Sequence, residues 1–547
     1  MERNDISKEK MKLSDSMKNI NKELFNLRIE AKLSLRKREL NNFFYNKRLF
    51  GNNSSNSSQN KIIWKLLYNE NNIKFNSDDS RIKYNLNVNE YDDEKILSLA
   101  SKYLKSGNID DIKYGIFMTQ IFIKRNMDQE LTNSINLLFI YELFHIIDKI
   151  NKQIDIIFNI FDIIINYSSI NTDKNLATIL LSPESYRIWG LCFNLQNFDI
   201  FYEIISIFNN IIQDNPIGSF NLIRSDFLRN NIFDFYMNQT IISQKMNEDK
   251  NDVYYYIIKD GINLLCSLLI VKTDNLDSIT RREVISSKEK IINILLIYSN
   301  TNSFDNYYKC IYSIENAIKY DPILFDELER NNFIENILIN KKFFDEKRLL
   351  YILNRIFGDY SAYKNNLSNK LLVEIINFEA KYLENCKESS YRKEIFWTLS
   401  NILLSDDKIY EKIFENESLL SNIFECFKNS YSFQEIREIL YFFSILFTYI
   451  NNKYFIELEK NHLLELVFYH SKNLCENRVD GLLICFQIFE FYLMFGYMMS
   501  KYFEGRNIIK EKFDKLGGKE LLEEYLNYPD DNLVKKVGFI FENFYQA

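Results

Sequence analysis

Helical segments follow one another from about residue 94 to the end of the chain, and this succession limits the possible folds more than any other feature. In segments of about ten to fifteen residues, apolar side chains recur at i, i+3, i+4 and i+7, the spacing of one helical face. Strand-like alternation of useful length is missing. The pattern predicts helices at Glu94–Leu104, Asp111–Lys124, Gln153–Tyr167, Phe201–Gln213, Tyr307–Tyr320, Glu346–Gly358, Tyr391–Leu404, Gln434–Tyr449 and Arg478–Phe495.

Several of these segments are apolar nearly all round, for example Ile439–Ile450. A helix of this kind is expected to lie buried between neighbours. The chain has 547 residues, too many for one small core. Its strongest helices recur at roughly 40–50 residues, close to the period of armadillo and HEAT repeats. We therefore predict an all-α solenoid of stacked helices, and periodicity alone leaves armadillo and HEAT open.

Composition agrees with a helical chain. There are 13 Gly and 4 Pro, against roughly 38 and about 27 in an average chain of this length. Sandwiches and propellers need these residues in their many turns, so β architectures are disfavoured. Neither GxGxxG nor GxxxxGK[ST] occurs, which argues against nucleotide-binding loops. The abundance of Asn, Ile, Lys, Tyr and Phe is typical of an AT-rich genome.

Cysteine and histidine offer little chemistry. The seven cysteines include no CxxC, and the three histidines form no zinc pattern. We expect the cysteines to be core residues in a reducing compartment, with no metal, no cofactor and no enzymatic activity. The first ten residues are charged, unlike a signal peptide. Polar residues interrupt the longest apolar stretches, such as Ile156–Tyr167, so no membrane span and an intracellular protein are expected.

Charge divides the chain unevenly. Residues 21–50 carry eight Lys/Arg against three Glu, and the formal net charge of the whole chain is −7. Residues 21–48 are predicted to be helical, with Arg28, Lys32 and Arg36 in a basic stripe. The Asn/Ser-rich stretch 51–60 is too polar to bury anything. The expected organisation is a basic arm at 1–50, a polar linker at 51–92 and a solenoid at 93–547. Such an arm can fold back on its acidic body or reach an acidic partner.

The segment Arg392-Lys-Glu-Ile-Phe-Trp-Thr-Leu-Ser-Asn-Ile402 is the most informative in the chain. Trp397 and Asn401 are four residues apart and share a helical face, with Glu394 one turn earlier. Asn carboxamides can hold a peptide backbone, indole faces can hold Lys and Arg stems, and carboxylates can take their charge. The alternative is that Trp397 is a core aromatic and Asn401 a solvated polar residue.

Three segments, in the same order, resemble the importin-alpha family of nuclear import adaptors. Residues 392–403 are similar to the third helix of the seventh armadillo repeat. Glu30-Ala-Lys-Leu-Ser-Leu-Arg-Lys37, with Lys47 and Arg48, resembles the importin-beta-binding segment. Lys515–Tyr525 and Ile540–Tyr545 look like the last repeat. The resemblance implies a right-handed armadillo-repeat α-solenoid of about ten repeats with an N-terminal importin-beta-binding helical arm.

The resemblance also implies a function. It is that of an adaptor that binds Lys/Arg-rich nuclear localisation signals of cargo, links them to an importin-beta-type receptor, and shuttles between cytoplasm and nucleus. A CAS-type export receptor is an implied further partner, and neither nucleic acid nor membrane is expected to be bound directly. The alternative is an armadillo scaffold that has lost basic-cargo binding. Of the family's autoinhibitory basic cluster only Lys47-Arg48 is present, so autoinhibition is not expected.

The implied site residues fall into three groups. In the family's C-terminal minor site they are Asn354, Glu394, Trp397, Asn401, Glu438 and Tyr441, with Ile445 at an expected Asn position. In a degenerate major site they are Phe158, Asp162, Asn210 and Asp214, with Ser206 at an expected Trp position. In the arm they are Arg28, Glu30, Leu33, Leu35, Arg36, Lys37, Lys47 and Arg48.

Alignment of the intermediate repeats is uneven. The family's Trp and Asn positions recur along the groove as a ladder of side chains. The fourth repeat, near Tyr254–Leu269, does not align with this ladder, and the fifth places Tyr312 and Asn316 on it. Loss of a Trp wall weakens a lysine pocket by about 1 kcal/mol or more. We therefore predict that basic peptides bind preferentially along Asn354–Tyr441.

Overall fold

The computed structural model describes residues 92–125, 137–150, 153–170, 174–212, 215–238, 253–299, 303–364, 367–406, 408–473, 478–500 and 506–545. The arm predicted at 1–50, with all of its site residues, and the linker up to residue 91 lie outside these ranges. Two compact units emerge, one ending at Asn331 and the other beginning at Asn332. They are called the N-terminal and the C-terminal unit below.

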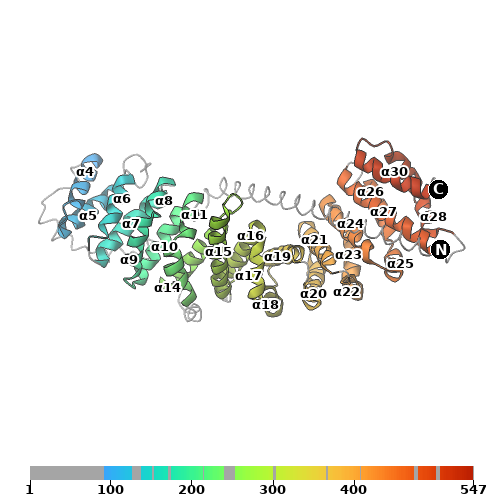
Figure 1. The fold of residues 1–547 in the computed structure, drawn as a ribbon, viewed down its shortest axis with the longest axis horizontal. Helices are drawn as coiled ribbons and strands as arrows, with labels where there is room; N and C mark the ends of the chain where they lie inside the picture. Colours follow the sequence, from blue (N-terminus) through green and yellow to red (C-terminus); the bar gives the residue numbers. More distant parts are fainter. Residues whose placement is uncertain are drawn as a thin grey trace. The chain divides into compact units, whose positions relative to one another are not determined.

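The described residues of the N-terminal unit form a succession of helices (Figure 1). Its elements are α4 Asp93–Leu104, α5 Ile109–Arg125, α6 Leu137–Ile146, α7 Ile154–Ile170, α8 Lys174–Leu180, α9 Pro183–Phe193, α10 Phe198–Ile212, α11 Pro216–Arg224, a π-helical turn Leu228–Ile232, α12 Phe233–Asn238, α14 Val253–Leu269, α15 Ser278–Tyr298, α16 Phe304–Tyr320, a 3-10 turn Pro322–Leu324 and α17 Phe325–Arg330.

The C-terminal unit is also helical throughout its described residues. Its elements are α18 Phe333–Asn340, α19 Lys347–Tyr363, α20 Asn369–Asn385, α21 Ser389–Ser405, α22 Tyr410–Glu415, α23 Glu417–Asn429, α24 Phe433–Tyr449, α25 Asn452–Lys460, α26 Leu463–Asn473, α27 Val479–Met499, α28 Ile508–Lys515, α29 Gly518–Tyr525 and α30 Asp531–Tyr545. Each helix predicted from the apolar spacing has a counterpart, and the described residues contain no strand. The prediction of an all-α solenoid is confirmed.

The few prolines stand where helices begin. Pro183 and Pro216 occupy the first turns of α9 and α11, where a missing N–H is not needed for an intrahelical bond. The residues before them, Ser182 and Asn215, cap these helices with their side-chain oxygens. Pro322 opens the 3-10 turn before α17 in the same way. All three prolines therefore lie in the first turn of a helix, where they do not interrupt its hydrogen bonds.

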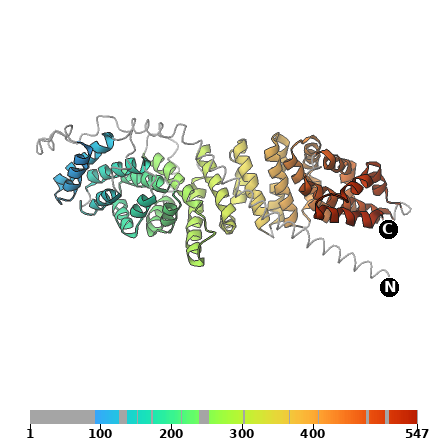
Figure 2. The ribbon, with the colours of Figure 1, turned by 90° about the horizontal axis from the view of Figure 1, so that it is seen from above.

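One helix of each repeat packs on its counterpart in the next. In the N-terminal unit α5, α7, α10, α14 and α16 contact one another in that order, and in the C-terminal unit α19, α21, α24, α27 and α30 do the same. The helices of both rows are labelled in Figure 1, and Figure 2 shows the succession of helices from above by sequence colour. The helices α19, α21, α24 and α27 begin at Lys347, Ser389, Phe433 and Val479, a recurrence of about 40–50 residues.

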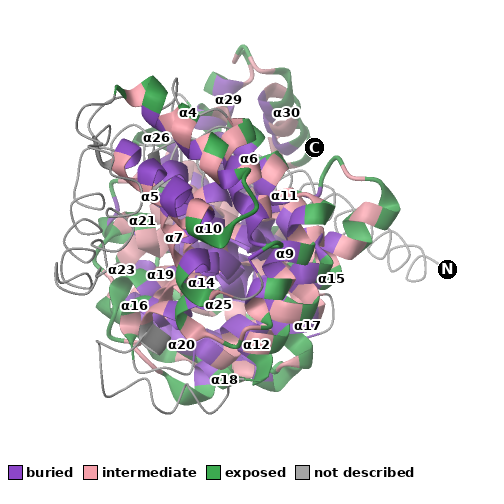
Figure 3. Ribbon diagram, turned by 90° about the vertical axis from the view of Figure 1, so that its left-hand side faces the viewer, coloured by how far each residue is buried: buried purple, intermediate pink, exposed green. Residues whose placement is uncertain are grey.

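Side-chain hydrogen bonds repeat the same spacing. Gln120 on α5 donates to Asn159 on α7, 39 positions away, and Asn401 on α21 donates to the Gly358 carbonyl on α19, 43 positions away. Buried apolar residues line the helix sides between these joints, and Figure 3 colours them purple along α5, α7 and α10. A solenoid stabilised in this way is held together mainly by contacts between neighbouring repeats.

Helix α27 corrects one prediction. An 18-residue window of this 21-residue helix has a mean hydropathy of 1.7, so by length and composition the helix could cross a membrane, although no span was expected from the sequence. The helix is mostly buried against α24, α26, α28 and α30. Leu482, Phe486 and Tyr492 are fully buried there. Helix α27 therefore has the environment of a core helix in this unit. The prediction that Ile439–Ile450 is buried is confirmed on α24.

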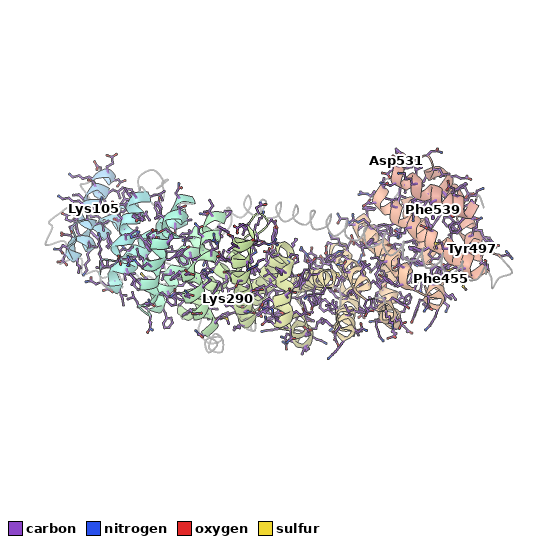
Figure 4. All side chains as sticks on the ribbon, in the orientation of Figure 1. Lys105, Lys290, Phe455, Tyr497, Asp531 and Phe539 are labelled. Atoms are coloured by element: carbon purple, nitrogen blue, oxygen red, sulfur yellow. The ribbon has the colours of Figure 1, made fainter. Side chains whose placement is uncertain are left out.

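Aromatic side chains differ sharply in exposure within the C-terminal unit. Phe455 is 3% exposed and stacks on Phe495 with ring centroids 4.5 Å apart. Tyr497 and Phe539 are 69% and 51% exposed and lie at the surface (Figure 4). Most of the large apolar residues in this unit nevertheless belong to its core, as expected for stacked helices.

A fully buried ion pair in the N-terminal unit joins α15 to the C-terminal end of α16. The Lys288 ammonium lies 2.5 Å from Asp321 Oδ2 and donates to the Val271 carbonyl at 2.6 Å. The Thr273 hydroxyl donates to the other oxygen of Asp321. Both charged side chains have no solvent exposure. A buried pair of this kind is tolerated because hydrogen bonds satisfy the remaining donors and acceptors.

Candidate peptide-binding surface

The six residues predicted for the minor site lie on three neighbouring helices of the C-terminal unit. We call Asn354, Glu394, Trp397, Asn401, Glu438 and Tyr441 the C-terminal cluster. They belong to α19, α21 and α24, and α21 contacts both of the others. The structure thus places the predicted residues on adjacent helices, as the repeat spacing implied.

Trp397 lies on Gly358 of the preceding helix. A Cβ added to Gly358 would come within 2.3 Å of Trp397 Cζ3 and 2.7 Å of the Thr398 hydroxyl, so only glycine allows this approach. Trp397 is 6% exposed. Its indole is therefore largely part of the packing between α19 and α21, which is close to the core-aromatic alternative.

The two ladder asparagines bond within the chain. Asn401 Nδ2 donates to the Gly358 carbonyl at 2.9 Å, and Asn401 is 2% exposed. Asn354 is fully buried and lies 2.6 Å from Thr398 Oγ1. With its amide oriented to satisfy both ends, its nitrogen also donates to Glu379 Oε1 at 2.9 Å. A peptide backbone would have to displace these bonds to reach either amide.

The acidic members of the cluster are also nearly buried. Glu394 is 4% and Glu438 2% exposed, and Glu438 pairs with Arg437 at 3.1 Å. Tyr441 is partly exposed, whereas Ile445, one turn further along α24, is buried. Both carboxylates are therefore largely shielded from solvent.

Sequence reasoning missed an ion pair that joins α21 to α24 beside this cluster; we call an ion pair of this kind, between helices of successive repeats, an ionic joint. Arg392 donates to both carboxylate oxygens of Glu435, at 2.6 and 3.0 Å, and Ser430 donates to the same group at 2.6 Å. Glu435 is fully buried, and this hydrogen bonding raises the pKa of the Arg392 guanidinium. Arg392 and Glu435 are 43 residues apart, about one repeat, and this separation could have indicated that they pair across adjacent helices.

The predicted major-site residues lie on α7 and α10 of the N-terminal unit. Phe158 and Asp162 are partly exposed on α7, and Ser206 and Asn210 are partly exposed on α10. Asn210 Nδ2 lies 3.2 Å from Ser168 Oγ and so connects the two helices. Asp214 lies outside the described residues. The structure thus brings Phe158, Asp162 and Asn210 onto adjacent helices.

Glu203 is an acidic residue of this surface that sequence reasoning did not select. It lies three positions before Ser206 and seven before Asn210, on the same side of α10. It is 5% exposed. Burial, together with the charges of Asp162 and Asp199, raises the pKa of its carboxyl to about 8. The helical spacing from Asn210 could have revealed it.

The neighbouring helix α14 adds a fourth carboxylate. The fourth repeat, which did not align, places Asp260 where Tyr202 of α10 hydrogen bonds to it. Burial raises the pKa of Asp260, although Lys259, Tyr202 and Lys309 oppose the shift. Asn209 also donates to the Asp260 carbonyl at 2.9 Å. We call Asp162, Asp199, Glu203 and Asp260 the acidic face.

The fifth repeat uses its predicted ladder residues internally. Asn316 on α16 is 1% exposed and donates to the Tyr312 carbonyl one turn earlier, at 3.0 Å. Tyr312 stacks parallel to Tyr308, with centroids 6.1 Å apart. Lys309 on the same helix donates to Asn263 of α14 at 3.0 Å. The row from α7 to α16 is thus joined by polar contacts and carries most of its carboxylates on α7, α10 and α14.

The described residues contain no group of three or more His, Cys, Asp and Glu side chains that could hold a metal ion. His145 is partly buried, its ring centroid lies 4.1 Å from that of Tyr141 at a tilt of 48°, and its pKa is lowered chiefly by burial.

Sequence comparison finds no match: no family model fits the chain, and no curated protein resembles it. Structural comparison does find similar folds. An engineered protein solved by the Northeast Structural Genomics Consortium matches with a TM-score of 0.55 and 10% identity, over 83% of this chain and 99% of that one. The fold assignment rests on this likeness together with the helix order.

Two other solved structures match with lower TM-scores. One is a designed armadillo repeat protein in complex with the peptide (KR)4, at a TM-score of 0.29 and 12% identity over 56% of this chain and 99% of that one. The other comes from a study of cadherin and beta-catenin, at 0.49 and 9% identity over 74% and 70%. The chain is an α-solenoid of stacked helical repeats, with the repeat length of armadillo and HEAT proteins.

Proposed function

We propose that the chain is a nuclear import adaptor of the importin-alpha kind. It would bind Lys/Arg-rich localisation signals on its solenoid and an importin-beta-type receptor through the basic arm at 1–50. The sequence likeness of the arm, of residues 392–403 and of the C-terminal repeat motivates this proposal. Shuttling between cytoplasm and nucleus belongs to the same proposal.

The observation that carries the proposal is the acidic face. Asp162, Asp199 and Asp260 lie on three consecutive helices, α7, α10 and α14, and give this face a negative potential in a chain whose body is acidic. Glu203, with a pKa of about 8, adds its charge only as the pH approaches and passes that value. A surface of this charge attracts basic peptides, raising both their association rate and their affinity. The polar contacts between these helices fix the spacing of the carboxylates.

One observation favours the alternative, an interaction scaffold without basic cargo. Asn354 and Asn401 bond within the chain and are at most 2% exposed. If basic peptides bind, we therefore expect the acidic face rather than the C-terminal cluster to be the principal site. This reverses the order of the two sites expected from the sequence.

The test measures binding of a fluorescently labelled lysine-rich signal peptide to the full chain by anisotropy. We expect Asp260→Asn to weaken binding about threefold or more, as loss of a charge-assisted contact does. We expect the double variant Trp397→Ala, Asn401→Ala to weaken it less, provided that circular dichroism shows both variants folded. Exposed Glu425→Gln on α23 serves as the charge-matched control. Absence of any binding would favour the scaffold, and the reverse order of effects would restore the minor-site prediction.

A further inference from the structure

His470 of α26 is a fully buried histidine at a contact between two repeats of the C-terminal unit. Its Nε2 atom lies 2.7 Å from the carbonyl oxygen of Phe427 on α23, 43 positions earlier in the chain. Phe427 carries one of the last four carbonyls of α23, and these have no partner within the helix. His470 therefore donates a hydrogen bond to a carbonyl that α23 itself cannot satisfy.

The second ring nitrogen of His470 has no such partner. Its Nδ1 atom is buried without a hydrogen-bond partner among the described residues. The imidazole lies against the Phe427 ring, with centroids 4.7 Å apart and a tilt of 31°. Because a carbonyl only accepts, the proton of the neutral ring is assigned to Nε2. A second proton would have to bind Nδ1, where no acceptor receives its hydrogen bond.

The charges around α26 do not compensate a protonated His470. Helices α23, α25 and α27 contact α26. Burial lowers the pKa of His470, the Phe427 carbonyl opposes this shift, and no charged or titratable side chain of these four helices contributes to it. Those side chains are Glu417, Glu425, Cys426 and Lys428 on α23, Lys453, Tyr454, Glu457, Glu459 and Lys460 on α25, Glu465, Tyr469 and Lys472 on α26, and Asp480, Cys485, Glu490, Tyr492 and Tyr497 on α27.

We propose that His470 makes the contact between α23 and α26 sensitive to acid. When the imidazole takes up a proton from solvent at Nδ1, it becomes a cation in a site that cannot solvate it. The contact then opens so that water reaches the ring, and the Phe427 carbonyl loses its donor. This device is independent of the proposed adaptor function, because it uses none of the residues assigned to peptide or receptor binding.

The direction of the pH effect follows from the lowered pKa of His470. In the closed contact the ring resists protonation, whereas in the open one it titrates near the ordinary value of about 6.5. The closed contact is therefore most stable above that value and loses stability as the pH falls below it, by at most a factor of ten per pH unit. Acid opens the contact, and neutral pH closes it.

The test measures amide hydrogen exchange of the full chain at about pH 7.0 and about pH 5.5, corrected for the chemical exchange rate at each pH. In the wild type we expect protection of α26 and of the last turn of α23 to fall about tenfold, and protection of α19 and α21 to change less than about twofold. In His470→Gln the fall should be about twofold or less, because a Gln amide can donate to the same carbonyl but does not ionise.

His462→Gln is the matched control, since the side chain of His462 is 75% exposed, and it should keep the wild-type loss of protection. An equal loss in the wild type and in His470→Gln, or no loss in the wild type, would overturn the proposal.

Nuclear magnetic resonance of the imidazoles gives a second readout that does not need the His470 variant to fold. The chain has three histidines, so substitution of His145 and of His462 identifies the signal of His470. We expect this signal to titrate at a lower pH than the ordinary midpoint of about 6.5. Titration of His470 at or above that midpoint would show that the closed contact accepts the charge, and would overturn the proposal.

Discussion

Gly358 shows how one residue controls the contact between two helices. Its hydrogen takes the place of a Cβ that would lie 2.3 Å from the Trp397 ring, and its carbonyl accepts the Asn401 amide. The same glycine thus brings α19 and α21 together and uses the hydrogen-bonding capacity of a ladder residue. The predicted binding residues of this repeat are also its packing residues.

We expect Gly358→Ala to destabilise the chain by about 1–3 kcal/mol, because the new methyl group must push the Trp397 ring out of its position. Thermal and urea denaturation of the full chain would measure the change. Gly538→Ala on α30 is the control, since its nearest atom is 4.0 Å away and alanine stabilises an open helical site. Equal effects of the two substitutions would contradict the account of the α19–α21 contact.

Sequence spacing correctly predicted which residues share a helical face. It did not predict which of those residues are buried by a neighbouring helix. Trp397 and Asn401 share a face, as four-residue spacing requires. That Asn401 is 2% exposed depends on Gly358, 43 positions earlier, and periodicity does not reveal such coverage. Asp162 was selected by likeness, whereas Glu203 was missed although it lies seven residues before Asn210 on α10.

At the scale of elements, two ionic joints link consecutive helices and differ in burial. Arg392 of α21 pairs with fully buried Glu435 of α24. Arg437 of α24 pairs with Asp480 of α27 at 3.2 Å, and the Asp480 side chain is 56% exposed. Both joints span 43 residues, so each links one repeat to the next. They offer a comparison in which burial is the main variable.

We expect Glu435→Gln to destabilise the C-terminal unit by about 3 kcal/mol or more, because the Arg392 charge loses its buried partner. Asp480→Asn should cost less than about 1 kcal/mol, since an exposed pair is screened by water. Urea denaturation followed by circular dichroism would compare the two. A larger effect at Asp480 would show that burial does not govern the strength of these joints.

The helices themselves were predictable because the 3.6-residue apolar period survives the unusual composition. The segment Gln434–Tyr449 was expected and α24 spans Phe433–Tyr449, and Tyr391–Leu404 was expected where α21 spans Ser389–Ser405. The exception was α27, whose apolar run is longer than the sequence reading allowed. There the apolar period alone cannot separate a core helix from a membrane span, and burial against four neighbouring helices is what distinguishes them.

On the scale of the whole molecule, charge is divided between arm and body. The basic segment 21–50 carries +5 within a chain of net charge −7. If the arm serves a receptor rather than the chain's own surface, the two binding functions proposed here are separable. That separation is what an adaptor requires, because it must hold cargo and receptor together.

We expect deletion of residues 1–60 to abolish capture by an immobilised importin-beta-type receptor, since the basic helix is lost. The same deletion should leave affinity for the lysine-rich peptide within about twofold, because only Lys47-Arg48 of the autoinhibitory cluster is present. Charge-reversal of Arg36 and Lys37 in the intact chain is the finer control and should affect the receptor alone. A marked rise in peptide affinity on deletion would instead reveal autoinhibition.

The hydrogen bonds that join successive repeats have a consequence for how the chain folds. They connect residues 39 to 51 positions apart, a small fraction of 547. Contacts this close in sequence need only short loops to close, and low contact order is associated with fast folding. Each unit can therefore nucleate at any well-packed pair of repeats and grow in both directions, including while the C-terminal repeats are still being synthesised.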